Sequence, residues 1–130
     1  MPIQIVVAGA LIAGGELLVA QRERPRALAG RWELPGGKVA PGETEREALA
    51  RELAEELGIA VAVGERLGDD VALGATTTLR AYLVTQTDAG TVCAHDHRQL
   101  RWVSADELHR LDWVPADRAW LPELTRRLAR

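Results

Sequence analysis

The residues with the clearest chemical meaning lie in one segment, from Gly37 to Ile59. Glu43 stands near its start, and the stretch that follows is rich in good helix formers. Glu52, Glu55 and Glu56 are spaced i, i+3, i+4, which places three carboxylates on one face of the expected helix. Like charges at this spacing cost about a few tenths of a kcal/mol per pair, so a cation is needed to offset the repulsion. Clustered carboxylate oxygens suit Mg²⁺ or Mn²⁺.

The loop before the helix adds further groups of the same kind. The glycines of Pro35-Gly36-Gly37 leave backbone carbonyl and N–H groups unshielded, so a carbonyl can join a metal shell or a phosphate can approach. Lys38 adds a point charge suited to phosphate oxygens. A pair between Glu43 and Arg51 would tie this loop to the helix. Together these groups predict metal-assisted hydrolysis of a phosphoanhydride, with water as the nucleophile.

A solvated acidic helix without any ligand is the competing interpretation, because the pair Glu47–Arg51 alone would stabilise such a helix. The complete pattern argues against it. G-x5-E-x7-R-E-L-x-E-E-x-G-I is filled at every position from Gly37 to Ile59. Ordinary residue frequencies give a chance match on the order of 10⁻⁹ per starting position.

The elements that must position these groups follow from hydrophobic pattern and turn residues. Thr44 and Glu47 form a capping box that begins the helix, and Gly58 ends it. Ser104 and Glu107 predict a second, short capped helix over 104–108. Strands are expected over 3–13, 16–21, 32–34, 38–39, 61–71, 76–85 and 99–103, with a hairpin at Gly14-Gly15, an arginine-carrying loop over 22–31 and a C-terminal helix from Pro115 towards Arg130. Strands without regular alternation with helices favour an α+β fold, a mixed sheet with helices on its faces.

Composition excludes several classes of protein. The 130 residues predict a single domain over 1–130. A net charge of −3 argues against a dedicated nucleic-acid-binding protein. Cys93 is the only cysteine, which excludes an intrachain disulfide and a multi-cysteine zinc site. The apolar run 5–13 is too short for a membrane span and lacks the flanks of a signal peptide, so we expect no membrane partner and a cytoplasmic location.

The segment from Gly37 to Ile59 resembles a complete Nudix box, and the whole chain resembles the MutT-type nucleoside triphosphate pyrophosphohydrolases. The similarity extends over VVAGALI, AQR, WELPGGK, RWV and WVPAD, and is strongest to actinobacterial MutT-like enzymes that act on CTP and dCTP. It implies an α/β/α sandwich around a mixed β-sheet (the Nudix fold), and a monomer or homodimer is expected. It also implies two or three Mg²⁺ ions, with Mn²⁺ as a substitute, and water attack on a nucleoside triphosphate to give NMP and pyrophosphate.

The resemblance also implies a role for individual residues. The implied metal ligands are the Gly36 carbonyl, Glu52, Glu55, Glu56 and Asp96, and Glu52 also activates water. The implied bracing and substrate-binding residues are Glu43, Arg51, Gly37, Lys38 and Arg22, the last of them near the base or ribose. Asp96 has an alternative interpretation as a loop aspartate in a polar turn. Its neighbours His95 and His97 are expected to be solvated or to lie behind the ligands.

The expected base preference depends on Asp117. Related enzymes that hydrolyse oxidised guanine nucleotides have an asparagine at this position, whose amide both donates and accepts. An ionised aspartate only accepts, which favours the exocyclic amine of cytosine and disfavours O6 of a purine. We therefore expect CTP, dCTP or 5-methyl-dCTP as substrates, with 8-oxo-dGTP as the alternative. A non-catalytic nucleotide sensor is the competing class, and the complete glutamate set argues against it. The chain has no phenylalanine, so a stacking partner must be Trp, Tyr or Arg.

Overall fold

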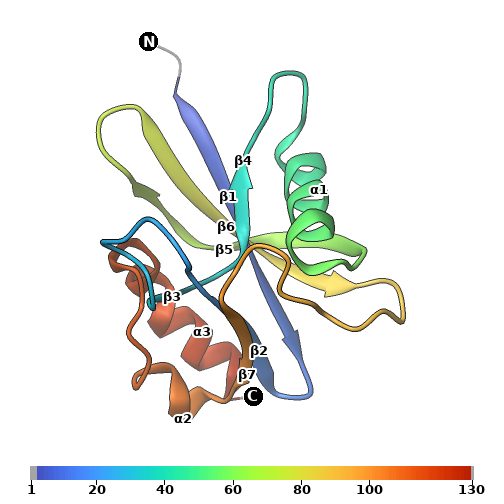
Figure 1. Cartoon of the computed structure of the whole chain (residues 1–130), viewed down its shortest axis with the longest axis vertical. Helices are drawn as coiled ribbons and strands as arrows, with labels where there is room; N and C mark the ends of the chain where they lie inside the picture. Colours follow the sequence, from blue (N-terminus) through green and yellow to red (C-terminus); the bar gives the residue numbers. More distant parts are fainter. Residues whose placement is uncertain (1–2, 130) are drawn as a thin grey trace.

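The computed structural model describes residues 3–129 and is built around one mixed sheet (Figure 1). The long strand β1 is its centre, because β6 pairs with it in parallel while β4 and β2 pair with its two halves in antiparallel fashion. The strands are β1 (Gln4–Ala13), β2 (Glu16–Gln21), β3 (Trp32–Glu33), β4 (Gly36–Lys38), β5 (Val61–Ala72), β6 (Thr77–Gln86) and β7 (Gln99–Val103). The sheet order is β3-β2-β1-β6-β5, with β4 on β1 and β7 on β2.

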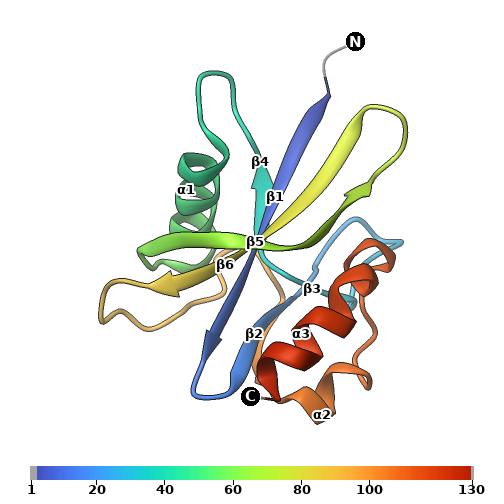
Figure 2. The same ribbon diagram turned by 180° about the vertical axis from the view of Figure 1, so that it is seen from behind.

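Helices cover both faces of this sheet, which confirms the expected sandwich (Figures 1 and 2). The helix α1 (Glu45–Leu57) packs on one face, over a core that includes Val7 and Leu11 of β1. On the other face α2 (Ala105–Leu108), the 3₁₀ helix η1 (Pro115–Trp120) and α3 (Leu121–Leu128) enclose a second core, which includes Ala8 and Ala10. The strict alternation along β1 is what a strand buried on both sides requires.

The ends of α1 match the sequence prediction. Thr44 is the N-cap, with the full capping box to Glu47, and Gly58 ends the helix with φ 72°. The left-handed value explains the glycine, since other residues avoid it. The second predicted box, of Ser104 and Glu107, also forms.

The C-terminal helix differs from the prediction. Pro115 begins a 3₁₀ segment, and the α-helix starts only at Leu121. Pro122 explains the division, because a proline has no N–H to donate and belongs in the first turn of a helix. The predicted end at Arg130 lies outside the described residues. No helix within residues 3–129 has the length and apolarity needed to cross a membrane.

Candidate active site

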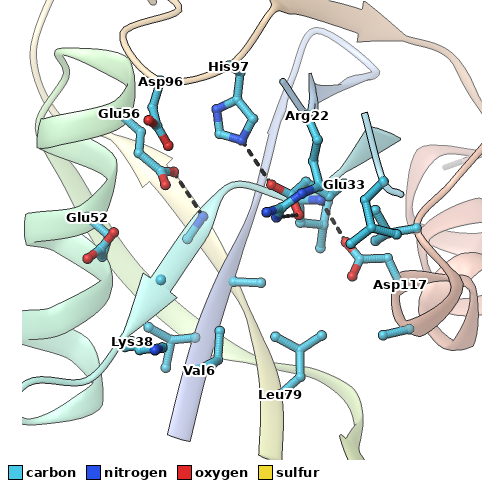
Figure 3. A pocket seen from close by; sticks show the side chains of 18 of the residues that line it. Val6, Arg22, Glu33, Lys38, Glu52, Glu56, Leu79, Asp96, His97 and Asp117 are labelled. Carbon is cyan, nitrogen blue, oxygen red and sulfur yellow. Dashed lines mark hydrogen bonds and ion pairs between the residues drawn. The ribbon is translucent and has the colours of Figure 1, made fainter. Parts of the chain in front are cut away.

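A cavity of about 640 Å³ opens between α1 and the C-terminal segment, over the N-terminal half of β1. This volume is typical of small-molecule sites. Figure 3 shows that polar side chains line it in three groups: carboxylates from α1 and the 87–98 loop, a central cluster, and Asp117 at the far side. The predicted residues in its wall are Arg22, Gly36, Gly37, Lys38, Glu52, Glu56, Asp96 and Asp117.

Two of the helix carboxylates reach the cavity because β4 has no side chains in their way. Gly37 faces Glu52 so closely that a Cβ there would overlap the carboxylate. Gly36 donates its N–H to Glu56 Oε2 at 3.1 Å. A Cβ on Gly36 would overlap the Val7 carbonyl oxygen of β1. The two glycines therefore have different tasks: Gly37 leaves room for the Glu52 carboxylate, and Gly36 lets β4 lie against β1.

The electrostatics of this end fit a divalent cation. Burial, together with the negative charges of Glu52, Glu33 and Asp96, raises the pKa of Glu56 to about 8, although the Gly36 N–H lowers it. Within residues 3–129, no three acidic, His or Cys side chains converge into a complete ligand set by themselves. Mg²⁺ needs no such set, because it commonly binds one or two carboxylates and completes its shell with water and substrate phosphates. Glu52, Glu56 and the Gly36 carbonyl match that pattern, with Asp96 in the same wall.

Arg51 braces this arrangement, as predicted. Its guanidinium binds Glu43 at 2.6 and 2.9 Å and the Lys38 carbonyl at 3.2 Å, which ties the loop to α1. It also donates to Glu52 at 2.9 Å. The Arg51 hydrogen bond lowers the pKa of Glu43 to about 2, helped by the Ala40 N–H.

Glu55 lies elsewhere than the other two helix glutamates. Its side chain is 60% exposed, pairs with Arg51 at 3.2 Å and is outside the cavity wall. The i+3 position faces the edge of the helix that turns to solvent, although i and i+4 face the cavity. The metal role of Glu55 stays a prediction. To reach the cavity, its side chain would have to turn away from Arg51.

Asp96 is brought to the cavity by two backbone anchors of its loop. His95 N–H donates to the Glu56 carbonyl at 3.0 Å, and Arg98 N–H donates to the Gln21 carbonyl at 2.8 Å. The loop thus spans from the last turn of α1 to the end of β2. Asp96 itself is exposed and pairs with Arg24 at 3.2 Å. Its position in the cavity wall supports the metal interpretation over a turn aspartate, and the ligand role remains a prediction.

At the opposite end, strand-like pairing carries Asp117 into place. Trp32 N–H donates to the Asp112 carbonyl at 2.9 Å, and Val114 N–H donates to the Trp32 carbonyl at 2.8 Å. The Asp117 side chain continues this ladder, since its Oδ2 accepts from Leu34 N–H at 2.8 Å. The side chain is thereby fixed against β3 and lines the cavity.

The burial of Asp117 changes its chemistry. The residue is only 3% exposed, and this burial raises its pKa to about 8, opposed by the Leu34 N–H. The premise that Asp117 is ionised, and hence only accepts hydrogen bonds, is therefore wrong near neutral pH. A neutral carboxyl carries one O–H donor beside an acceptor oxygen, in the same order as an asparagine amide. Asp117 alone thus no longer favours cytosine over oxidised guanine.

Two wall residues that sequence reasoning missed or undervalued lie between the two ends. Glu33 accepts from Arg22 at 2.9 Å and from His97 at 2.9 Å. The side chain of His97 is only 5% exposed, which excludes the solvated alternative and leaves the expected position behind the ligands. The signal available for Glu33 was a lone charged residue in the apolar run Trp32–Leu34, directly before the glycines.

None of the aromatic stacking candidates among the described residues lines the cavity. All four tryptophans and Tyr82 are absent from its wall among the described residues, and Trp32, Trp113, Trp120 and Tyr82 are buried in the two cores. The apolar part of the wall is aliphatic instead, with Leu28, Leu34, Leu73, Leu79 and Val114 among its members. Arginine is the remaining stacking candidate of the three types expected.

Comparison with known proteins gives a consistent picture. The NUDIX domain family matches residues 3–124. A Mycobacterium tuberculosis protein named "Putative 8-oxo-dGTP diphosphatase 2" is 66% identical over 128 residues, covering 96% of this chain and 90% of that protein. The "CTP pyrophosphohydrolase" of Escherichia coli K12 is 42% identical over 114 residues, covering 86% and 84%. A crystal structure of a MutT NUDIX hydrolase from Burkholderia pseudomallei superimposes with a TM-score of 0.80 at 30% identity, covering 95% of this chain and 98% of that one.

Proposed function

This chain belongs to the Nudix hydrolases, and from that premise we propose that it cleaves nucleoside triphosphates to a nucleoside monophosphate and pyrophosphate, with Mg²⁺ as cofactor. The observation that carries the proposal is the difference between the two ends of the cavity. Carboxylates that fit a cation stand at one end, and a buried carboxyl that fits a base stands at the other. A molecule with phosphates on one side and a heterocycle on the other matches both ends at once.

The residues divide the chemistry between them. When bound at Glu52, Glu56 and the Gly36 carbonyl, Mg²⁺ supplies charge neutralisation of the phosphate oxygens and activation of water. Glu52 accepts the proton of the attacking water, and its orientation is held by the Arg51 hydrogen bond at 2.9 Å. Lys38, exposed on the rim of the cavity, binds phosphate oxygens as a point charge.

For the base, an oxidised guanine nucleotide is the first candidate. A neutral Asp117 donates its O–H to O6 and accepts from the N7–H that oxidation creates. Unmodified guanine offers two acceptors, O6 and N7, at this edge, so its N7 faces the Asp117 acceptor oxygen without a proton between them, at a cost of about 1–3 kcal/mol. The name of the 66% identical mycobacterial protein supports the same candidate.

A cytidine nucleotide is the second candidate, and the same side chain favours it. The O–H of a neutral Asp117 donates to N3 of cytosine, and the other oxygen accepts from the exocyclic amine. This supplies the N3 donor that an ionised aspartate lacks. The name of the 42% identical Escherichia coli protein supports CTP. Both candidates predict a housekeeping role in the nucleotide pool, and a cytoplasmic location stays a prediction.

The decisive experiment is a turnover screen with Mg²⁺ over NTPs, dNTPs, 8-oxo-dGTP and 5-methyl-dCTP, by phosphate release with and without inorganic pyrophosphatase. We expect a signal only when pyrophosphatase is present, because the product is pyrophosphate. Phosphate without the coupling enzyme would mean a nucleoside diphosphate product and would overturn the proposed bond. Nucleotide binding without turnover would identify a sensor. Competition between 8-oxo-dGTP and CTP then ranks the two bases.

A further inference from the structure

Glu33 lines the middle part of the cavity and can accept more hydrogen bonds than it receives from the described residues. Its Oε1 accepts from Arg22 Nη1 and its Oε2 from His97 Nε2, each at 2.9 Å. A carboxylate offers about four lone-pair sites, so these two bonds leave roughly half of its capacity free. The side chain is 16% exposed and lines the cavity, so its free sites face the space that a ligand would fill.

His97 is held in one orientation by this contact. A carboxylate only accepts, so Nε2 carries the proton that it donates to Glu33. Nδ1 is buried and finds no hydrogen-bond partner among residues 3–129. Because its side chain is only 5% exposed and its Nε2 contacts Glu33, His97 helps to hold the Glu33 carboxylate in place. Arg22 acts from the other side, with its Nε fixed on the Arg24 carbonyl at 2.9 Å.

Glu33 lies between the two ends of the site, and the directions of two pKa shifts agree with this position. Its carboxylate raises the pKa of Glu56 at one end and of Asp117 at the other. Figure 3 shows the same order, with Glu33 and His97 between the carboxylates of α1 and Asp117. A nucleotide whose phosphates reach Glu56 and whose base reaches Asp117 places its sugar at this point. The donors that a nucleotide sugar presents are its 2′- and 3′-hydroxyl groups.

We propose that Glu33 accepts a hydrogen bond from a sugar hydroxyl of the substrate, and that Arg22 and His97 are positioning residues that hold its carboxylate for that bond. The proposal rests on the proposed nucleotide hydrolase function and extends it to the sugar. Glu33 becomes a specificity-determining residue that recognises whether the hydroxyl is present.

The test compares kcat/KM for one base as ribonucleotide, 2′-deoxyribonucleotide and 2′,3′-dideoxyribonucleotide, for example CTP, dCTP and ddCTP. A hydrogen bond to a charged group is typically worth a factor of about 10 to 100. We expect a loss of about that size at one step of the wild-type series. The step from CTP to dCTP identifies the 2′-hydroxyl, and the step from dCTP to ddCTP identifies the 3′-hydroxyl. A wild-type series that stays within about threefold at both steps overturns the proposal.

Repeating the nucleotide series with Glu33→Ala completes a double-mutant-type cycle between the Glu33 side chain and the sugar hydroxyl. In this variant the sensitive step should shrink to within about twofold, because the acceptor is gone. Glu33→Gln keeps an acceptor oxygen of similar size and should keep part of the step. An unchanged step in both variants overturns the assignment to Glu33. Glu23→Ala is the matched control: Glu23 also lines the cavity but pairs with Arg98 at 3.5 Å, and the step should persist without it.

The positioning residues are tested by rescue. His97→Leu should reduce the hydroxyl step, and His97→Gln, whose amide N–H can replace Nε2, should restore most of it. A step that His97→Leu leaves intact overturns the role of His97. Thermal melts verify folding of every variant. A wild-type series without a hydroxyl step overturns the proposal even where a variant fails to fold. Absence of turnover with every nucleotide would overturn the proposed function, whereas turnover without a hydroxyl step overturns only this inference.

Discussion

Asp117 illustrates how much a single carboxyl depends on its surroundings. The residue belongs to a short polar sequence, and only its burial against β3, at 3% exposure, makes the protonated form dominant at neutral pH. The Leu34 N–H occupies Oδ2, so Oδ1 is left to carry the O–H into the cavity. The side chain is then equivalent to an amide in donor and acceptor order.

A pH dependence follows from this protonation. As the pH rises through about 8, Asp117 loses the O–H that the base accepts, so kcat/KM should fall on the alkaline side. Asp117→Asn keeps a donor and an acceptor at every pH, and should flatten this limb while preserving activity near neutrality. Profiles of kcat/KM for both proteins test it. A variant with the wild-type alkaline limb would assign that limb to another group.

The same exchange has a stability signature that needs no substrate. The folded pKa of Asp117 is about 8 against an ordinary value of 3.8, so its contribution is fully present below about pH 4 and is lost as the pH rises through about 8. Between these values the unfolded chain is ionised while the folded protein keeps its proton. Melting temperatures of Asp117→Asn should therefore decline less across this window than those of the wild type.

The helix glutamates should differ in their importance. Glu52→Gln should lower turnover by orders of magnitude with an unchanged melting temperature, because the residue lines the cavity and is the proposed base. Glu55→Gln is the matched control on the same helix, since its carboxylate is 60% exposed and outside the wall. We expect a clearly smaller loss there, measured by pyrophosphate release. Equal losses would show that Glu55 turns inward when metal and substrate bind.

At the scale of elements, the contact of β4 with β1 and α1 builds the site. The strand pairs with β1 through Val6↔Lys38 and Ala8↔Gly36 and passes directly beneath the carboxylates of α1. No other residue type leaves enough room at both glycines. The loop before α1 and the sheet therefore form one structure, in which the Gly36 N–H holds Glu56 and the space at Gly37 admits Glu52.

The two glycines should fail in different ways when a methyl group is added. Gly37→Ala displaces the Glu52 carboxylate, a side chain that can move, so activity should collapse while the fold persists. Gly36→Ala meets the Val7 carbonyl oxygen, which belongs to a central strand, so the melting temperature should fall first. Parallel melting and turnover measurements distinguish the two. Loss of folding in Gly37→Ala would mean that Glu52 is locked more firmly than its surroundings suggest.

At the scale of the whole molecule, the sheet brings together charges that repel. Glu52 and Glu56 come from α1, Asp96 from the 87–98 loop and Glu33 from β3. The charges of Glu52, Asp96 and Glu33 all act on Glu56 and raise its pKa. Arg51, Arg24 and Arg22 pair with Glu52, Asp96 and Glu33, whereas Glu56 has no cationic partner among the described residues. Such a concentration of negative charge is destabilising until a cation binds.

Mg²⁺ should therefore raise the melting temperature of the protein without nucleotide. A cation that binds only the folded state stabilises it by mass action. Tryptophan fluorescence melts in MgCl₂, compared with NaCl at equal ionic strength, measure the shift. Glu52→Gln combined with Glu56→Gln should abolish the specific part, because it removes the side-chain ligands. An equal shift in that variant would place the cation elsewhere.

The sequence predicted most elements and the chemical class, because those depend on local rules. Caps at Thr44 and Gly58, the hairpin at Gly14-Gly15 and the pairing of Glu43 with Arg51 follow from residue types at fixed spacings. The division of the C-terminal helix at Leu121 was missed, although Pro122 carried the signal. The helical spacing also placed Glu52 and Glu56 correctly on one face.

What the tertiary structure alone decided is the environment of each group. Glu55 turns to solvent, the tryptophans fill the cores, and Glu33 meets His97 across 64 positions of sequence. Burial and long-range contacts set these outcomes, and neither is encoded by spacing along the chain. The Gly37–Ile59 pattern by itself predicted a hydrolase of the Nudix family, and family membership is confirmed. The proton on Asp117, and with it the order of preference among bases, exists only because the fold removes that carboxyl from water.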